Sequence, residues 1–147
     1  MKIQLDPRYK DIVLTKLINT LMKNGKKSIA EKAVYKTLEL IKTKYNKSPL
    51  PILKEAIENI KPSVEVKTIK KHGKEYRIPC EINTKRQQSL GIRWIVKSLK
   101  KSSEKGLKFK LFNEIMNALN KKGLAYKMKD DMHQQAEKNR SNIHYRW

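Results

Sequence analysis

The sequence lacks the features that mark several large classes of protein. It has one cysteine, Cys80, so a disulfide within the chain is excluded and a reducing compartment is expected. No apolar run approaches the ~18 residues of a membrane span. The first ten residues, MKIQLDPRYK, lack the apolar core of a secretory signal and do not resemble an uncleaved transit peptide. We therefore expect a soluble or peripheral protein.

Residues that usually carry catalysis are also scarce. The five glycines stand singly, so there is no phosphate-binding glycine loop. His72 and Cys80 do not form a nucleophile–base pair, because nothing orients the histidine. Asp130, His133 and Glu137 fall on one helical face at a spacing that suits a metal, but a solvated helix accounts for them better. We predict no enzyme, no catalytic residues, no metal site and no cofactor.

Acidic residues are too few to balance the basic ones. Lys and Arg number 35 against 14 Asp and Glu, which gives a net charge of +21 on 17.3 kDa. Such an excess destabilises the folded chain unless a polyanion neutralises it. Nucleic acid is the commonest such partner and an anionic membrane surface the second. The 29 lysines outnumber the 6 arginines, and lysine suits phosphates better than base edges. We therefore expect the protein to recognise the backbone and shape of a nucleic acid rather than its base sequence.

Apolar periodicity predicts a mainly α protein. The length of 147 residues suits a single domain, 1–147. Ser28 with Glu31 indicates a capping box, and Pro62 ends a helix. The fold predicted is a six-helix domain with one protruding two-stranded β-hairpin arm between the third and fourth helices. The helices are expected over residues 10–23, 29–44, 50–61, 85–101, 107–120 and 124–139.

Residues 63–82 change to the two-residue period of β-strands. The side-chain faces match when Val64 pairs with Ile82, which leaves residues 72–74 as a three-residue turn. That register sets Glu65 opposite another glutamate, a cost that a bulge would relieve. The apolar base can pack on the helices, whereas the tip is cationic and protrudes. The cations of the arm are Lys67, Lys70, Lys71, Lys74 and Arg77.

The fourth predicted helix has a cationic face. No acidic residue occurs between Ile82 and Ser103, whereas six basic residues do. A merely solvated face usually mixes glutamate with lysine, so this pattern favours a binding face. The loop before the second helix can also hold a phosphate, at Lys26 and Lys27. The basic residues of the fourth-helix region that we predict to bind RNA are Arg86, Arg93, Lys97, Lys100 and Lys101.

A short tail of about residues 140–147 ends in HYRW. A terminal tryptophan is costly to leave in water unless it is stacked or buried. Tyr145, Arg146 and Trp147 either pack back on their own domain, or stack on a base or dock on a neighbour. Both possibilities stay open at this point.

Several stretches together resemble one family. They are LMKNGKKS at 21–28, ENIKPSVEVK at 58–67, YRIPCEI at 76–82, RQQSLGIRWIV at 86–96 and the terminal HYRW. The chain resembles the small-subunit ribosomal protein seven family over nearly its full length, and is most similar to mitochondrial members at RQQSLGIRW and the terminal tryptophan. It departs from the family at its N-terminus, where bacterial members carry an Arg-rich extension, so the RNA contacts there are expected to be reduced or replaced. It also departs at the hairpin turn, His72-Gly73, which is usually a glycine pair.

The resemblance implies that the protein binds the 3′ major domain of small-subunit ribosomal RNA and organises the subunit head. The hairpin is then expected near the exit-site tRNA and the messenger path. The C-terminal region is implied to lie near a neighbouring ribosomal protein, which favours docking for Tyr145, Arg146 and Trp147. No membrane partner is implied. The implied location is the mitochondrial ribosome, with a plastid or the bacterial cytoplasm as alternatives. The matching RNA-binding positions are Lys26, Lys27, Lys67, Lys70, Lys71, Lys74, Arg77, Arg86, Arg93 and Lys97.

Two rival functions remain. A basic helical DNA-binding protein would use Arg86, Gln87 and Gln88 to read base edges, although the fourth helix devotes its exposed face to cations that suit the nucleic-acid backbone. An enzyme with a metal on Asp130 and His133 is the other rival. Duplex DNA binding tests the first of these and metal analysis tests the second.

Overall fold

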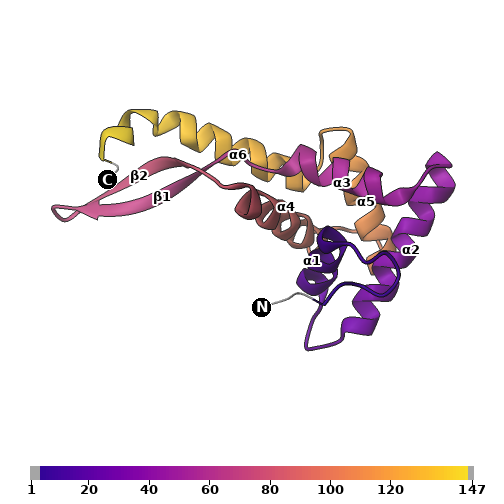
Figure 1. Ribbon diagram of the computed structural model, residues 1–147. Coiled ribbons are helices and arrows are strands. Elements are labelled where there is room, and N and C mark those ends of the chain that lie inside the picture. The colour runs from indigo at the N-terminus through magenta and orange to yellow at the C-terminus, as the bar shows by residue number, and fades with distance from the viewer. Residues whose placement is uncertain (1–3, 146–147) are drawn as a thin grey trace.

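A computed structural model describes residues 4–145, except the side chain of Tyr145, and confirms the predicted fold class. Over these residues the chain forms six α-helices and one antiparallel β-hairpin, which lies between the third and fourth helices in the chain (Figure 1). A short 3₁₀ helix, η1, follows the last α-helix. The elements are α1 (Ile12–Leu21), α2 (Lys27–Tyr45), α3 (Pro49–Ile60), β1 (Val64–Lys71), β2 (Lys74–Glu81), α4 (Thr84–Leu99), α5 (Leu107–Leu119), α6 (Leu124–Lys138) and η1 (Arg140–Tyr145).

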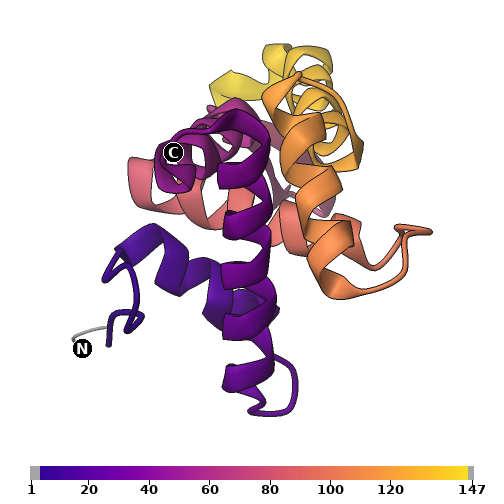
Figure 2. The same ribbon diagram turned by 90° about the vertical axis from the view of Figure 1, so that its right-hand side faces the viewer.

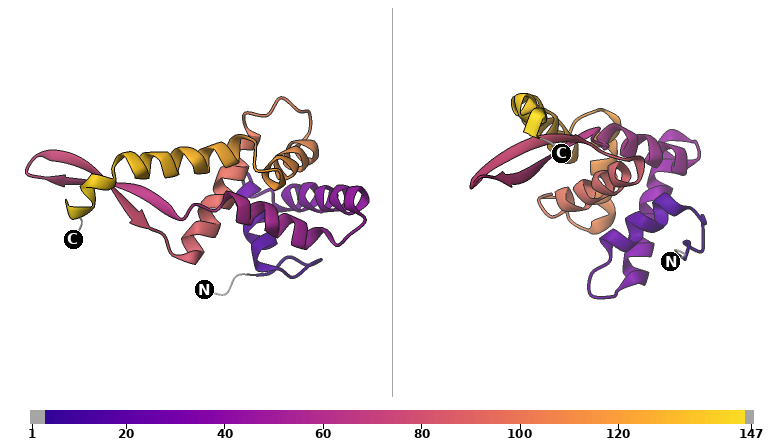
Figure 3. Two further views of the ribbon diagram at one scale, coloured as in Figure 1. Left: turned by 90° about the horizontal axis from the view of Figure 1, so that it is seen from above. Right: turned by 60° about the vertical axis from the view of Figure 1, so that its left-hand side comes forward.

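The hairpin extends away from the helices as an arm. Figure 2, which views the molecule from the end opposite the arm, shows the helices gathered behind α2. Figure 3 shows α6 running toward the arm, so that η1 lies beside the strands while the turn extends beyond it. Asn142 of η1 donates a hydrogen bond from Nδ2 to the carbonyl oxygen of Arg77, at 3.0 Å. No helix within residues 4–145 is long and apolar enough to cross a membrane.

The core is built from the predicted apolar stripes. Helices α1 to α5 each bury their stripe against the others, because i, i+3, i+4 spacing sets those side chains on one face. Within helix α6 only Ala125 and Ala136 are buried among the residues that the structure describes. The largest fully buried side chains are Leu14, Leu17, Ile18, Leu38, Ile41, Leu53, Ile57, Ile60, Ile78, Ile92, Ile95 and Leu111.

The predicted capping box of α2 is wrong. The helix begins at Lys27, so Ser28 lies inside its first turn, and the residue at the cap position, Lys26, makes no side-chain hydrogen bond. The helix starts early because Gly25, with φ of +75°, completes the preceding tight turn directly before it. Side-chain caps occur instead at α1, where Asp11 accepts from the amide of Leu14, and at α4.

The predicted hairpin register is wrong by one residue. Val64 lies opposite Glu81 rather than Ile82, and Lys71 lies opposite Lys74. The turn therefore has two residues, His72 and Gly73, with φ of +52° and +77°. Two positive φ values in a two-residue loop match the twist of the strands, and histidine enters this region more readily than most residues. The shift also sets Glu65 opposite Cys80, so two glutamates no longer face each other.

Two glycines give a test of helix packing. A Cβ on Gly91 would lie 3.7 Å from the carbonyl oxygen of Ile57, an ordinary contact. Gly91→Ala should therefore raise the free energy of unfolding by about 0.5–1 kcal/mol, through helix propensity.

Gly123 gives the opposite expectation. It has φ of +95°, and a Cβ there would lie 2.8 Å from Cβ of Asn117. Gly123→Ala should therefore lower the free energy of unfolding by roughly 1–3 kcal/mol. Urea denaturation measures both, and equal losses would contradict this packing.

Candidate RNA-binding surface

The arm concentrates positive charge along both of its strands. Lys67, Lys70, Lys74 and Arg77 are exposed, and Lys71 is half-buried. Lys71 lies directly opposite Lys74 beside the turn, and like charges in such a cross-strand pair destabilise a hairpin. Phosphates lying against the tip would relieve that repulsion.

The corrected register distributes the cations over both faces of the arm. Successive side chains of a strand point to opposite faces, and cross-strand partners share a face. Lys67, Lys71 and Lys74 therefore lie on one face, whereas Lys70 and Arg77 lie on the other. Lys70 forms an exposed ion pair with Glu75, at 3.8 Å. The arm can therefore contact anions on both of its faces.

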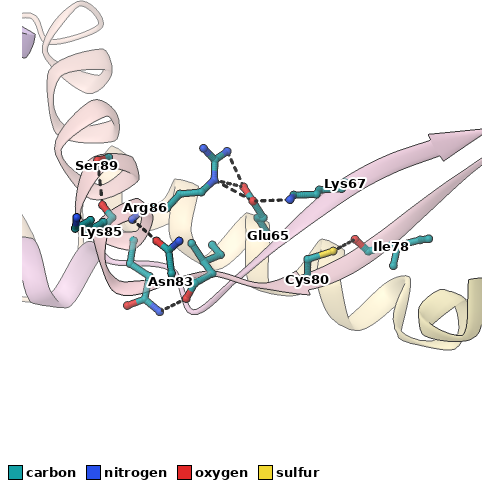
Figure 4. A network of polar contacts seen from close by, with 10 residues as sticks. Glu65, Lys67, Ile78, Cys80, Asn83, Lys85, Arg86 and Ser89 are labelled. Atoms are coloured by element: carbon teal, nitrogen blue, oxygen red, sulfur yellow. Dashed lines mark hydrogen bonds and ion pairs between the residues drawn. The ribbon is translucent and has the colours of Figure 1, made fainter. Parts of the chain in front are cut away.

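The root of the arm is joined to α4 by a buried carboxylate. Arg86 donates from Nε to Oε1 of Glu65 at 2.9 Å and from Nη2 to Oε2 at 2.9 Å (Figure 4). The side chain of Glu65 is 9% exposed. The hydrogen bond and then the negative charge of Glu65 raise the pKa of the Arg86 guanidinium. Arg86 therefore links β1 to α4, and its RNA contact stays a prediction.

The other predicted cations of α4 remain at the surface. Arg93 and Lys97 of α4 and Lys100 at its C-cap are exposed at spacings of four and three residues, so they share one face of the helix. That face lies beside the stripe formed by the buried Ile92, Ile95 and Leu99. Lys101 is exposed just beyond the helix. The predicted cationic face of this helix is therefore present, and its exposed cations form a row from the middle of α4 to its end.

Two predicted residues that are far apart in sequence meet around one hollow. Lys26, from the loop between α1 and α2, and Lys100, from the end of α4, both line a cavity of about 440 Å³. Lys23 and Lys110 line it too, although neither belongs to the RNA-binding set predicted from the sequence. Lys27, the first residue of α2, is half-buried and does not line the cavity. The RNA roles of Lys26 and Lys27 stay predictions.

His133 has a structural contact that the sequence did not reveal. Its Nε2 accepts a hydrogen bond from the backbone amide of Ser63 at 3.2 Å. Burial, and then the charge of Lys129, lower the pKa of His133, which favours the neutral ring that this bond needs. Lys129 also donates to the carbonyl oxygen of Asn59 at 3.0 Å. These bonds join α6 to the end of α3 and the root of the arm.

The side chains considered as metal ligands do not form a cluster. Glu137 approaches Arg140 at 3.4 Å, and Asp130 is exposed. Over residues 4–145 no group of three or more His, Cys, Asp or Glu side chains is arranged to hold a metal ion. Of the predicted tail contacts, Arg146 and Trp147 lie outside the described residues, as does the side chain of Tyr145. Those contacts stay predictions.

Comparison with known proteins identifies the family. Residues 1–140 match the family described as Ribosomal protein S7p/S5e. The chain is 44% identical to small ribosomal subunit protein uS7 of Pelagibacter ubique over 142 residues, which cover 97% of this chain and 91% of that protein. It is 47% identical to uS7 of Geotalea uraniireducens with the same coverage, and 42% identical to uS7 of Shewanella sediminis over 99% of this chain and 94% of that one. These relatives are bacterial, so they do not support the expected mitochondrial origin. The chain belongs to the ribosomal protein S7p/S5e family, whose relatives named here are proteins of the small ribosomal subunit.

Proposed function

We propose that this protein is a structural constituent of the small ribosomal subunit that binds the 3′ major domain of the subunit's RNA and organises the subunit head. The observation that carries the RNA contact is the set of exposed cations on the arm and on α4, on a chain of net charge +21. Family membership supports the place in the subunit. The family is one of structural proteins not known as enzymes, and we propose no reaction.

The mechanism is the rigid presentation of cations to an RNA fold. A-form RNA has a deep, narrow major groove, so proteins contact its phosphates, 2′-hydroxyls and irregular junctions. An isolated two-stranded ribbon is marginal in water. Here Glu65–Arg86, Ser63–His133 and Asn142–Arg77 join the arm to α4, α6 and η1. Because the helices hold the arm, little ordering is left to occur on binding.

The finer placement of the protein rests on the family resemblance of the sequence. We propose that the arm lies near the exit-site tRNA and the messenger path, and that the C-terminal tail docks on a neighbouring ribosomal protein. The length of the arm beyond η1 supports the first (Figure 3). A mitochondrial location is proposed only from the RQQSLGIRW stretch and the terminal tryptophan.

Salt dependence tests the proposed RNA contact. Each phosphate that the protein neutralises contributes about −0.7 to −0.9 to the slope of log affinity against log salt. If six of the predicted cations each neutralise one phosphate, the slope is about −4 to −5. Titration of a 3′ major domain RNA fragment from low to high salt measures it. A flat slope contradicts the proposal, and tighter binding to duplex DNA of equal length would favour a DNA-binding protein.

A further inference from the structure

The hollow between the α1–α2 loop, the end of α4 and the start of α5 has a cationic rim. Lys23, Lys26, Lys100 and Lys110 line it, and the lining holds no acidic residue among those that the structure describes. Its volume of about 440 Å³ is within the range of roughly 300–1,000 Å³ typical of ligand sites. The charges of four lysines that line one cavity repel one another, so an anion in the cavity would stabilise them.

The floor of the hollow is apolar. Leu21, Ile29, Val96, Leu99 and Leu107 supply it, and no aromatic side chain takes part. Ile29 stands out because it is 58% exposed on the first turns of α2, where it has no core role. A flat apolar group entering the hollow would cover this aliphatic surface and gain from its burial.

We propose that the hollow takes one unpaired nucleotide of RNA, with the base against the aliphatic floor and the adjoining phosphates on the lysine rim. This inference rests on the proposed function, because the ligand comes from the same RNA. Sequence-specific proteins recognise RNA mostly through unstacked bases of loops and bulges. A base that is paired within a helix cannot enter a cavity, so the site distinguishes irregular RNA from regular RNA.

Continuity with α4 favours RNA over an acidic peptide. Lys100 at the rim continues the exposed row of Arg93 and Lys97 along the same helix. A strand whose phosphates lie on that row therefore reaches the rim without leaving the positive surface. An acidic peptide with a bulky apolar side chain would fill the hollow, but it would leave the exposed cations along α4 without a partner.

The test compares two RNA hairpins of equal length, one fully paired and one with a single bulged nucleotide. Burial of the bulged base against the aliphatic floor favours this hairpin, so the full-length protein should bind it about tenfold tighter than the paired hairpin at equal salt, a difference of about 1.4 kcal/mol. Ile29→Ser should abolish that preference. The matched control is Ile12→Ser, since Ile12 is 53% exposed, stands at the other end of α1 and does not line the hollow; it should keep the preference. Lys110→Ala should weaken binding of the bulged hairpin more than that of the paired one.

Other results would contradict the nucleotide site, the proposed function or both. Equal affinity for the two hairpins, with the steep salt slope intact, removes the nucleotide site but leaves the proposed function. Binding of neither hairpin removes both. A preference that survives Ile29→Ser and Lys110→Ala, in variants that melt as the parent does, also refutes the site. Binding of a glutamate-rich amphipathic peptide that Ile29→Ser abolishes, without any preference between the hairpins, assigns the hollow to a protein partner instead.

Discussion

Changing Lys70, Lys71 and Lys74 together to glutamate is expected to weaken RNA binding by roughly 100-fold at low salt while the fold stays intact. The three residues lie at or next to the two-residue turn at the end of the arm, where Lys70 and Lys74 are exposed and Lys71 is half-buried. Replacing Lys70 removes its exposed ion pair with Glu75, and such pairs contribute little to stability. Lys71 and Lys74 already face each other as like charges, and two glutamates there preserve that relation. The melting temperature should therefore change little.

The control for this variant reverses three lysines elsewhere. Lys32, Lys36 and Lys47 are exposed, lie outside the predicted RNA-binding set, and produce the same change of net charge when replaced by glutamate. The arm variant should also reduce the magnitude of the salt slope by about two to three, one for each lost phosphate contact. If the control weakens binding equally, net charge alone drives association. If the arm variant unfolds, the tip is a structural element.

The largest loss of stability should follow Asp6→Ala. The carboxylate of Asp6, a residue that is 1% exposed, accepts hydrogen bonds from the backbone amides of Tyr9 at 2.7 Å and Asp11 at 2.9 Å, and from the hydroxyl of Tyr35 at 3.2 Å. Thr15 completes the site by accepting from the Asp6 amide at 2.8 Å. Alanine leaves several partly buried donors unsatisfied, so the free energy of unfolding should fall by about 3 kcal/mol. Urea denaturation at neutral pH measures this loss.

The pH dependence of that loss provides its control. Burial raises the pKa of Asp6, but hydrogen bonds from the amides of Asp11 and Tyr9 and from Tyr35 outweigh it, so the pKa lies below its ordinary value of 3.8. The folded state therefore binds this proton less readily than the unfolded state does. The contribution of the carboxylate is present above pH 3.8 and is lost as the pH falls through the lowered pKa. The difference between parent and variant should narrow in that acid range, and a constant difference would mean that the carboxylate charge is irrelevant.

The helices were predictable because their signal is local. The stripe of α4, with Ile92, Ile95 and Leu99, and its cationic face could both be read within a few turns of sequence. Pro62 directly after Lys61 likewise set the end of α3 within a residue. The position of the arm followed from the change of period at residues 63–82.

Contacts between distant residues were not predictable from the sequence. The hairpin register is set by a two-residue turn, in which His72 has a positive φ. The sequence had instead predicted a turn of three residues. Arg86 was assigned to RNA because Glu65 lies 21 residues away and carries no sign of pairing with it. The 70 residues between Ser63 and His133 hid that contact in the same way. The hollow also escaped prediction, since three separate segments build it.

Sedimentation of the endogenous protein with ribosomal subunits tests the central claim most directly. A sucrose gradient run at low magnesium separates small subunits from large ones, and immunoblotting then locates the protein. The account predicts that the protein sediments with the small subunit and is released by high salt, as contacts made largely by lysine require. Recovery only at the top of the gradient, or with the large subunit, would contradict it.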